Sequence, residues 1–349
     1  MASVSCDLML YFSSVTYVTR FKKMNLAKYI IVIIGLSVSL FGSLQAEETI
    51  RIGVLKFGTV SWELDVIKRN QWDKVAGINL EIIPYGGKQA TLVALQGGAV
   101  DVVVNDWLWV SKQRDAGKAY TFIPYSTALG SLMVAADSDI HAPSDLINKR
   151  LGIAGGALDK SWLLLQSLSR QGYALDLAAE AEIKFGAPPL INAQLENKRL
   201  DAVLNYWHYS ARLEAKGYRQ LVSINNVLNQ LLGFKVDLPM IGYVFDQNWA
   251  NERKNSLMAF QSLLEKSRLR LLNSDMEWES LRKLMRVSDE KTFAMLRDGY
   301  RSGIPKSWSK QERAAATIMT SILAAAGGEK LLGPTATLNR GTFWPEVEF

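Results

Sequence analysis

Two short polar and aromatic motifs are the residues of this sequence best suited to recognising a small molecule. Asn-Asp-Trp occupies positions 105–107 and Asn-Tyr-Trp occupies positions 205–207, each directly after an apolar run. An asparagine amide offers two donors and an acceptor for a polar group, and a tryptophan offers a large rigid apolar face with one N–H. The motifs therefore indicate ligand recognition, with core packing of the tryptophans as the alternative.

Two glycine-containing loops could hold an anion. The loops at 57–62 and 155–162 each follow a predicted strand and run into a predicted helix, with Ser61 in the first and Asp159 and Ser161 in the second near the helix start. Free backbone N–H groups and the positive end of a helix suit a carboxylate or sulfonate. Simple helix capping is the alternative, above all for Asp159, whose charge would repel an anion.

These motifs belong to an internal repeat with a spacing of one hundred residues. The matched pairs are Ser-Trp at 61–62 and 161–162, Tyr-Gly at 85–86 and Phe-Gly at 185–186, Leu95 and Leu195, Asp101 and Asp201, the two Asn-x-Trp motifs, and Gly117 and Gly217. Arg-Ile-Gly at 51–53 matches Arg-Leu-Gly at 150–152, and one loop residue reconciles the different offset. Agreement of Asn, Trp, Ser and Gly in one register indicates two similar structural units.

The elements that position these residues are predicted by alternating short apolar runs and helical segments, a pattern typical of βαβ units with parallel strands. Strands are expected at 51–55, 80–84 and 100–104, with extended apolar segments at 129–136 and 238–245 after the two units. From about residue 246 the chain is expected to be rich in helices, with helical spacing at 257–272 and 313–326. The predicted fold class is α/β.

The N-terminal 46 residues have the parts of a secretory signal. Four basic residues precede an apolar run at 29–41, and Ala46 offers a small residue for cleavage. The run is shorter than the roughly 20 residues needed to span a bilayer, so an uncleaved anchor is the lesser alternative. A signal of ordinary length begins at Met24, which offers an alternative start codon. If translation begins at Met24, residues 1–23 lie upstream of the true start. The predicted location is the periplasm.

Composition excludes several classes of protein. At about 150 residues per domain, 349 residues predict two domains, and 48% hydrophobic with 21% charged residues is ordinary for a globular chain. The single cysteine, Cys6, lies in the predicted signal, and two histidines are too few for common zinc sites. No cofactor and no metal are therefore expected. Removal of four Lys or Arg and one Asp with the signal leaves 36 basic and 33 acidic residues, a balance of +3 that does not favour nucleic acid.

Two similar units, two crossing segments, a helical tail and an export signal together resemble a bacterial type II periplasmic solute-binding protein. Within that group the chain is similar to the nitrate, sulfonate and taurine-type binding proteins of ABC importers. The local marks are Ile-Gly-Val-Leu-Lys-Phe-Gly at 52–58, the helical segment 88–98 with the strand 100–104 after it, and Leu-Ile-Asn-Lys-Arg-Leu-Gly-Ile-Ala at 146–154.

The resemblance implies two lobes, each a Rossmann-like, mostly parallel sheet flanked by helices. Residues 47–131 and 242–349 would form one lobe, residues 137–238 the other, and the crossings near 129–136 and 238–245 a two-strand hinge. The lobes would close on a ligand about this hinge. The expected partners are a small-molecule ligand and, transiently, an ABC permease of the inner membrane; the protein itself is expected to be a monomer.

Ligands of open α/β sheets bind outside the carboxyl ends of the strands, and this rule selects the candidate site residues. Lys88 and Gln89 open the helix after the second strand, and Ser131 and Tyr243 lie in the crossings. The full candidate set is Phe57, Thr59, Ser61, Trp62, Lys88, Gln89, Asn105, Trp107, Ser131, Asp159, Ser161, Trp162, Asn205, Trp207 and Tyr243. Of the four repeat-related tryptophans, at least one or two are expected in the cleft.

The expected ligand is an organic anion such as a sulfonate or carboxylate. A flat heterocycle of the thiamine-pyrimidine type, stacked between tryptophans, is the alternative, and Asp106 with Asp159 leaves a cationic ligand open. The protein is not expected to be an enzyme, because the sequence lacks the G-x-S-x-G, G-x-G-x-x-G and phosphate-loop patterns. Related enzymes of thiamine-pyrimidine or menaquinone biosynthesis are the enzymatic alternative, which the export signal argues against.

Overall fold

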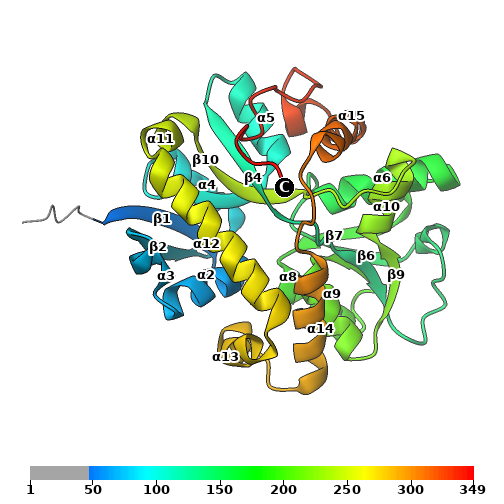
Figure 1. The fold of residues 1–349 in the computed structure, drawn as a ribbon. Coiled ribbons are helices and arrows are strands. Elements are labelled where there is room, and N and C mark those ends of the chain that lie inside the picture. Colours follow the sequence, from blue (N-terminus) through cyan, green and yellow to red (C-terminus); the bar gives the residue numbers. More distant parts are fainter. Residues whose placement is uncertain (1–46) are drawn as a thin grey trace, which may run out of the picture. The chain divides into compact units, whose positions relative to one another are not determined.

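Two five-stranded sheets organise residues 47–349, the part of the chain that the computed structural model describes (Figure 1). The predicted signal at 1–46 lies outside these residues. The first sheet has the order β2 (Ile78–Tyr85), β1 (Glu48–Leu55), β3 (Val102–Asp106), β10 (Ile241–Asp246), β4 (Tyr120–Ser126). The second has the order β7 (Glu182–Gly186), β6 (Arg150–Ala154), β8 (Ala202–Asn205), β5 (Ser131–Val134), β9 (Arg219–Ser223).

The two sheets have the same topology. In the first, β1 pairs in parallel with β2 and β3, and β10 is antiparallel to β3 and β4. In the second, β6 pairs in parallel with β7 and β8, and β5 is antiparallel to β8 and β9. Each antiparallel strand comes from one of the predicted crossing segments: β5 lies between the two units in the sequence and joins the second sheet, and β10 follows the second unit and returns to the first sheet. The predicted α/β fold class with two mostly parallel sheets is confirmed.

Helices flank both sheets. They are α2 (Val60–Arg69), α3 (Trp72–Val75), α4 (Lys88–Gln96), α5 (Trp107–Asp115), the 3₁₀ helix η1 (Pro143–Leu146), α6 (Lys160–Tyr173), α7 (Leu177–Glu180), α8 (Pro188–Glu196), α9 (Trp207–Ala215), α10 (Ile224–Leu232), α11 (Gln247–Glu252), α12 (Lys254–Asn273), α13 (Asp275–Met285), α14 (Glu290–Ser302) and α15 (Lys310–Leu332). Among the helices of residues 47–349, none combines the length and the apolar character needed to cross a membrane.

The predicted helix-rich tail connects the two units. Helix α15 begins with a capping box in which Ser309 and Glu312 satisfy each other's backbone groups. Its buried face, which includes Met319 and Leu323, packs in one core with residues of α5 and α6. Helix α14 lies against α9 (Figure 1), and a second core joins α2 to α12, α13 and α14. The C-terminal helices thus contact elements of both sheets.

The internal repeat is visible as a duplicated ion pair. Arg51 Nη2 lies 2.6 Å from Asp101 Oδ1 and Arg51 Nε 3.0 Å from Oδ2, and the backbone N of Arg51 donates to Oδ2 at 2.8 Å. Arg150 and Asp201 repeat this geometry with the same three distances. Each pair ties the first strand of a unit, at Arg51 within β1 and at Arg150 at the start of β6, to the residue before the third strand of that unit. The bidentate contact therefore fixes the register of these strands in both units.

We expect Asp101→Ala to lower the free energy of unfolding by about 1–3 kcal/mol, because it removes charge-assisted hydrogen bonds. Asp201→Ala should cost less, since the Asp201 side chain is 29% exposed and that of Asp101 only 9%, and water screens the more exposed pair. Urea unfolding of both variants checks this order. A larger loss for Asp201→Ala would contradict it.

Candidate functional site

The carboxyl ends of β1 and β3 in the first sheet and the helix starts that follow β6 and β8 in the second line a cavity of about 210 Å³, here called the inner cavity. The first sheet contributes Leu55 at the end of β1 and Asn105 and Asp106 at the end of β3. The helix starts that complete the wall belong to α2, α4, α6 and α9, and the remaining wall comes from the crossings at 128–130 and 240–241. This is the place that the strand-end rule predicts for a ligand.

Asp106 joins the two sides of the inner cavity. Its Oδ1 caps α5 by accepting from the backbone N of Trp109 at 2.9 Å. Its Oδ2 lies 2.8 Å from the Nζ of Lys88, the first residue of α4, and 2.8 Å from the Nζ of Lys160, the first residue of α6. Burial would raise the pKa of Asp106, but the two ammonium groups outweigh it and hold that pKa well below its usual range. Asp106 is therefore charged and shared between elements of different sheets.

Asp159 is the second carboxylate of the inner cavity. It caps α6 by accepting from the backbone N of Ser161 at 3.0 Å, and the hydroxyl of Tyr206 donates to it at 3.5 Å. Burial raises the pKa of Asp159 and lowers that of Lys160. Two ammonium groups thus face two carboxylates in the inner cavity, and Asp106 is the more readily ionised of the two carboxylates.

Asn105 is a polar residue of the inner cavity that lacks internal partners, and among the described residues the Nδ1 of His208 in the same lining is also unpaired. Its side chain is buried, and neither the Nδ2 nor the Oδ1 of its amide has a hydrogen-bond partner among the described residues. The repeat-related Asn205 donates to Pro188 O at 2.9 Å and to Asn192 Oδ1 at 2.7 Å, and accepts from the backbone N of Tyr206 at 2.8 Å. Buried polar groups are rarely left unpaired, which makes Asn105 a candidate for contact with a ligand.

Trp207 provides the large aromatic face of the inner cavity. Its ring meets that of Trp62 edge to face, with centroids 6.0 Å apart. The ring also lies against Gly299 of α14, where a Cβ would be 2.8 Å from the Trp207 Cζ3. Trp62 in turn packs on Trp278 and Tyr300. The indole of Trp207 is therefore held in place by elements of the C-terminal tail.

The structure places the other members of the repeat-related tryptophan pairs in the core. Trp107 is fully buried in α5, its Nε1 donates to Pro239 O at 3.0 Å, and its ring contacts Phe343. Trp162 is buried in α6 within the same core as α15. The first turns of α5 and α6 face the C-terminal helix, which the sequence pattern did not reveal.

Four further predicted residues lie outside the cavity linings. Gln89 is exposed on the first turn of α4, and Asn205 is bonded internally as described. Ser131 donates to Gln220 Oε1 at 2.8 Å. The hydroxyl of Tyr243 reaches the buried Glu63. Within the described residues these side chains have internal partners or face solvent, so the structure does not bring them to the site.

Glu63 organises a buried polar network behind the inner cavity. Its carboxylate accepts from Arg268 Nε at 3.1 Å, from the Tyr300 hydroxyl at 2.9 Å and from the hydroxyl of Tyr243. The adjacent Tyr125, whose pKa is raised by burial and by Glu63, lies 3.0 Å from Thr59 Oγ1, and both line the cavity. The network fixes the wall formed by α2 and β4.

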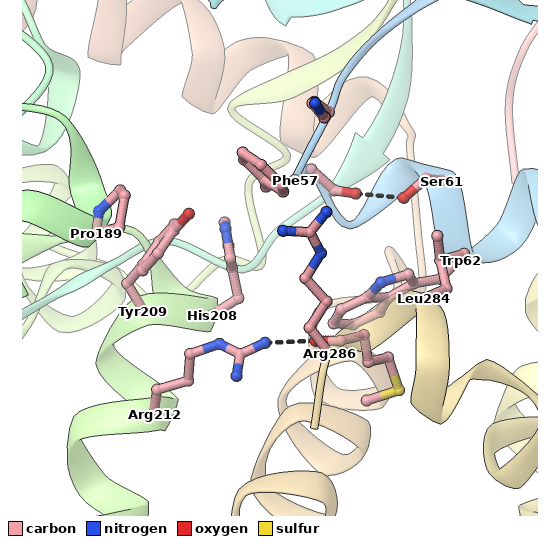
Figure 2. A pocket seen from close by; sticks show the side chains of 12 residues that line it. Phe57, Ser61, Trp62, Pro189, His208, Tyr209, Arg212, Leu284 and Arg286 are labelled. Atoms are coloured by element: carbon pink, nitrogen blue, oxygen red, sulfur yellow. Dashed lines mark hydrogen bonds between the residues drawn. The ribbon is translucent and has the colours of Figure 1, made fainter. Parts of the chain in front are cut away.

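A second hollow of about 440 Å³, here called the outer chamber, adjoins the inner cavity (Figure 2). Gly58, Ser61 and His208 line both. Its other walls come from the loop after β1, from α9 and from the end of α13: Lys56, Phe57, Trp62, Pro189, Tyr209, Arg212, Leu284, Met285 and Arg286. Burial lowers the pKa of His208 to about 3. This imidazole is therefore neutral at physiological pH.

The structure thus gathers nine of the predicted residues around the two hollows: Phe57, Thr59, Ser61, Trp62, Lys88, Asn105, Asp159, Ser161 and Trp207. Sequence reasoning missed Lys160, Tyr206, Arg212 and Arg286 as site residues. Lys160 and Tyr206 stand at helix starts that were already selected, so the strand-end rule could have found them. Arg286 ends a helix of the tail, and no local signal connects it with the strand ends.

Fold and site define a two-lobed α/β protein with its cavity between two similar sheets, as in type II solute-binding proteins. The family model described as NMT1/THI5 like matches residues 67–275, and the chain belongs to this family. The predicted resemblance to sulfonate- and nitrate-type binding proteins is confirmed. None of the curated proteins compared with the chain matches it.

Solved structures share this fold at low sequence identity. The alkanesulfonate-binding protein SsuA from Xanthomonas axonopodis pv. citri bound to MOPS matches with a TM-score of 0.67 and 16% identity, over 86% of this chain and 99% of that chain. The periplasmic aliphatic sulphonate binding protein SsuA from Escherichia coli matches with 0.68 and 18%, over 86% and 98%. The desulfurization enzyme DSZB matches with 0.56 and 14%, over 80% and 93%.

Gly299→Ala should destabilise the protein although alanine favours a helix by roughly 1 kcal/mol, because the new methyl group collides with the Trp207 ring. In a Trp207→Ala background the same substitution should become neutral or stabilising. Chemical denaturation of the two single variants and the double variant measures this coupling. Equal effects of Gly299→Ala in both backgrounds would show that the two residues do not meet.

Asp159→Asn should preserve or raise the free energy of unfolding at pH 7, because asparagine also caps a helix and carries no charge to bury. The pKa of Asp159 in the folded protein is raised, so the wild type loses stability as pH rises through it and the advantage of the variant shrinks toward pH 4.

Asp145→Asn is the matched control of opposite sign. The backbone N–H groups of His141 and Ala142 lower the pKa of Asp145, so this variant should lose stability at pH 7 and approach the wild type in acid. Unfolding curves at both pH values measure the two differences. Loss of stability at pH 7 in Asp159→Asn would contradict the assignment.

Proposed function

We propose that this protein is the solute-binding component of an ABC importer and captures one small organic solute in the inner cavity. Membership of the NMT1/THI5-like family and the fold shared with sulfonate-binding proteins support a solute-binding role. The predicted signal at 1–46 supports release into the periplasm. A transient complex of the monomeric protein with an inner-membrane permease completes the proposal.

The single observation that carries the proposal is the buried and unpaired amide of Asn105. A buried amide without partners costs roughly 1–3 kcal/mol, and a ligand with an adjacent acceptor and donor would satisfy both of its atoms. The amide neither takes up nor releases a proton at neutral pH, and so it suits binding and not proton transfer. We therefore favour a receptor over an enzyme, although the same fold occurs in a desulfurization enzyme.

An organic anion is the ligand class that we propose. Two SsuA proteins of this fold are named for binding sulfonates, and lysines 88 and 160 offer ammonium groups at the two helix starts. The unpaired amide of Asn105 would hold the polar head of such a solute beside these ammonium groups. A flat heterocycle of the thiamine-pyrimidine type is the second candidate, favoured by the Asn105 amide and the Trp207 face.

Closure of two lobes about a hinge is part of the proposal. Residues 47–131 with 242–349 would form one lobe and residues 137–238 the other, joined near 129–136 and 238–245. The ion pair between Lys160 and Asp106 would hold the closed state, because it joins helix and strand ends of different sheets.

A thermal-shift screen of sulfonates, carboxylates, pyrimidines and amines tests the proposal, because a ligand at a hundredfold excess over its dissociation constant stabilises by about 2.7 kcal/mol. For a solute found in this way, we expect Asn105→Ala and Trp207→Ala each to weaken binding more than tenfold. Calorimetry measures the affinities. Unchanged affinity in both variants would remove the solute from the inner cavity.

Asn205→Ala is the matched control, because it removes the repeat-related amide. Asn205 bonds only within the protein, so its loss should reduce stability, whereas Asn105→Ala should leave stability unchanged or higher. The folded fraction of Asn205→Ala should bind the solute with an affinity within threefold of the wild type. Equal losses of binding in the two variants would show that Asn105 acts only through the fold.

A further inference from the structure

The outer chamber concentrates positive charge. Lys56, Arg212 and Arg286 line it, and none of the described residues that line it is acidic. The contacts that the structure shows for these cations are with aromatic rings and a backbone carbonyl. The Cζ of Arg286 lies 4.3 Å from the centre of the Phe57 ring, the Nζ of Lys56 lies 5.9 Å from the same centre, and Arg212 Nη2 donates to Met285 O at 2.6 Å (Figure 2).

The charges of Arg212 and Arg286 both affect the pKa of the Tyr209 hydroxyl. Burial raises the pKa of this hydroxyl, and the charges of Arg212 and Arg286 both oppose that rise. Burial also lowers the pKa of Arg212 against the opposing effects of Tyr209 and the more distant Asp289. The carboxylate of Asp289 is already used as the cap of α14, where it accepts from Thr292 N at 2.8 Å. An anion between these cations would relieve their mutual repulsion.

The backbone at Arg286 adds an independent observation. Arg286 ends α13 with a φ of 54°, in the left-handed region where glycine is the usual residue of a helix end. An arginine there costs conformational energy. Its side chain reaches over Phe57 into the outer chamber (Figure 2). The position thus carries a cation where the backbone alone would favour glycine.

The sizes of the two hollows indicate one extended occupant. The inner cavity alone is smaller than the roughly 300–1,000 Å³ of ordinary ligand sites, and the two hollows together fall within that range. Residues 58, 61 and 208 line both, so the two hollows adjoin at these residues. His208 at this boundary is neutral, and it therefore does not repel either end of such a ligand.

We propose that the outer chamber is an anion subsite and that the solute has two parts: a polar head on Asn105 and an oxyanion held by Lys56, Arg212 and Arg286. This inference rests on the proposed function, since it takes the inner cavity as the site of the head. It narrows the ligand class to elongated organic anions whose sulfonate, carboxylate or phosphate group lies several bonds from the head.

Methanesulfonate alone is the probe of the subsite, titrated to 50 mM against chloride at constant ionic strength. We expect saturable thermal stabilisation of the wild type and at least a tenfold weaker apparent affinity in Arg286→Gly and in Lys56→Gln. Arg286→Gly relieves the backbone strain, so the loss of binding should come without loss of stability. Arg286→Lys should recover part of the affinity. Arg199→Gln, at an exposed arginine outside both hollows, should bind as the wild type does.

The outcomes separate this inference from the proposed function. Asn105→Ala should bind methanesulfonate normally while losing the solute found by screening. The anion subsite is overturned if the wild type shows no saturable binding of methanesulfonate, or if Arg286→Gly and Lys56→Gln both bind it as tightly as the wild type does. Either result leaves the role of Asn105 intact. Loss of the screened solute in Arg286→Gly but not in Asn105→Ala would instead overturn the inner-cavity assignment.

The solute itself gives the second measurement. An analogue in which the anionic group is replaced by an amide of similar size should bind the wild type at least tenfold more weakly than the anion. In Arg286→Gly the two compounds should differ by less than threefold. A preference for the anion that survives in Arg286→Gly would place the charge recognition elsewhere.

Discussion

The carboxylate of Asp106 accepts ammonium groups from two helices that belong to different sheets, and the inner cavity depends on this contact. The negative charge of Asp106 lies between the ammonium groups of Lys88 and Lys160, which begin α4 and α6. The same charge ties Lys160 to the strand end of the first sheet. Without it, the ammonium groups of Lys88 and Lys160, which each lie 2.8 Å from this carboxylate, would repel each other with no negative charge between them. The remaining polar wall, formed by Asn105, Asp159 and Tyr206, keeps its place around this centre.

The two repeated units contribute equivalent elements to the inner cavity, and they differ in the hydrogen bonding of equivalent residues at their strand ends. The ion pairs of Arg51 with Asp101 and of Arg150 with Asp201 have retained one geometry, so the frames of the two units correspond. At the strand ends the equivalents differ, because Asn105 is unpaired and Asn205 is bonded internally. The two units therefore share one backbone arrangement, but only the first unit has an unpaired amide at this position.

The sequence was sufficient for the features that depend on local pattern and repetition. Strand alternation, the two crossing strands, the tail helices and the strand ends as the place of the cavity all followed from it, and Asn105 was among the residues selected. It could not tell Trp207 from Trp107, because both begin a helix after a strand and only the packing of α14 and α15 separates them. Arg286 reaches the site because segments far apart in the sequence come into contact, and the spacing of residues within either segment does not predict that contact.

The position of β10 in the first sheet has a consequence for how the chain folds. Residues 241–246 form the strand between β3 and β4, so those two strands lack this shared neighbour until more than one hundred later residues have been made. Pairing of such high sequence separation is slow to form. The first sheet therefore cannot be completed by a nascent chain that ends before residue 240, and β3 and β4 stay unjoined until β10 has been made.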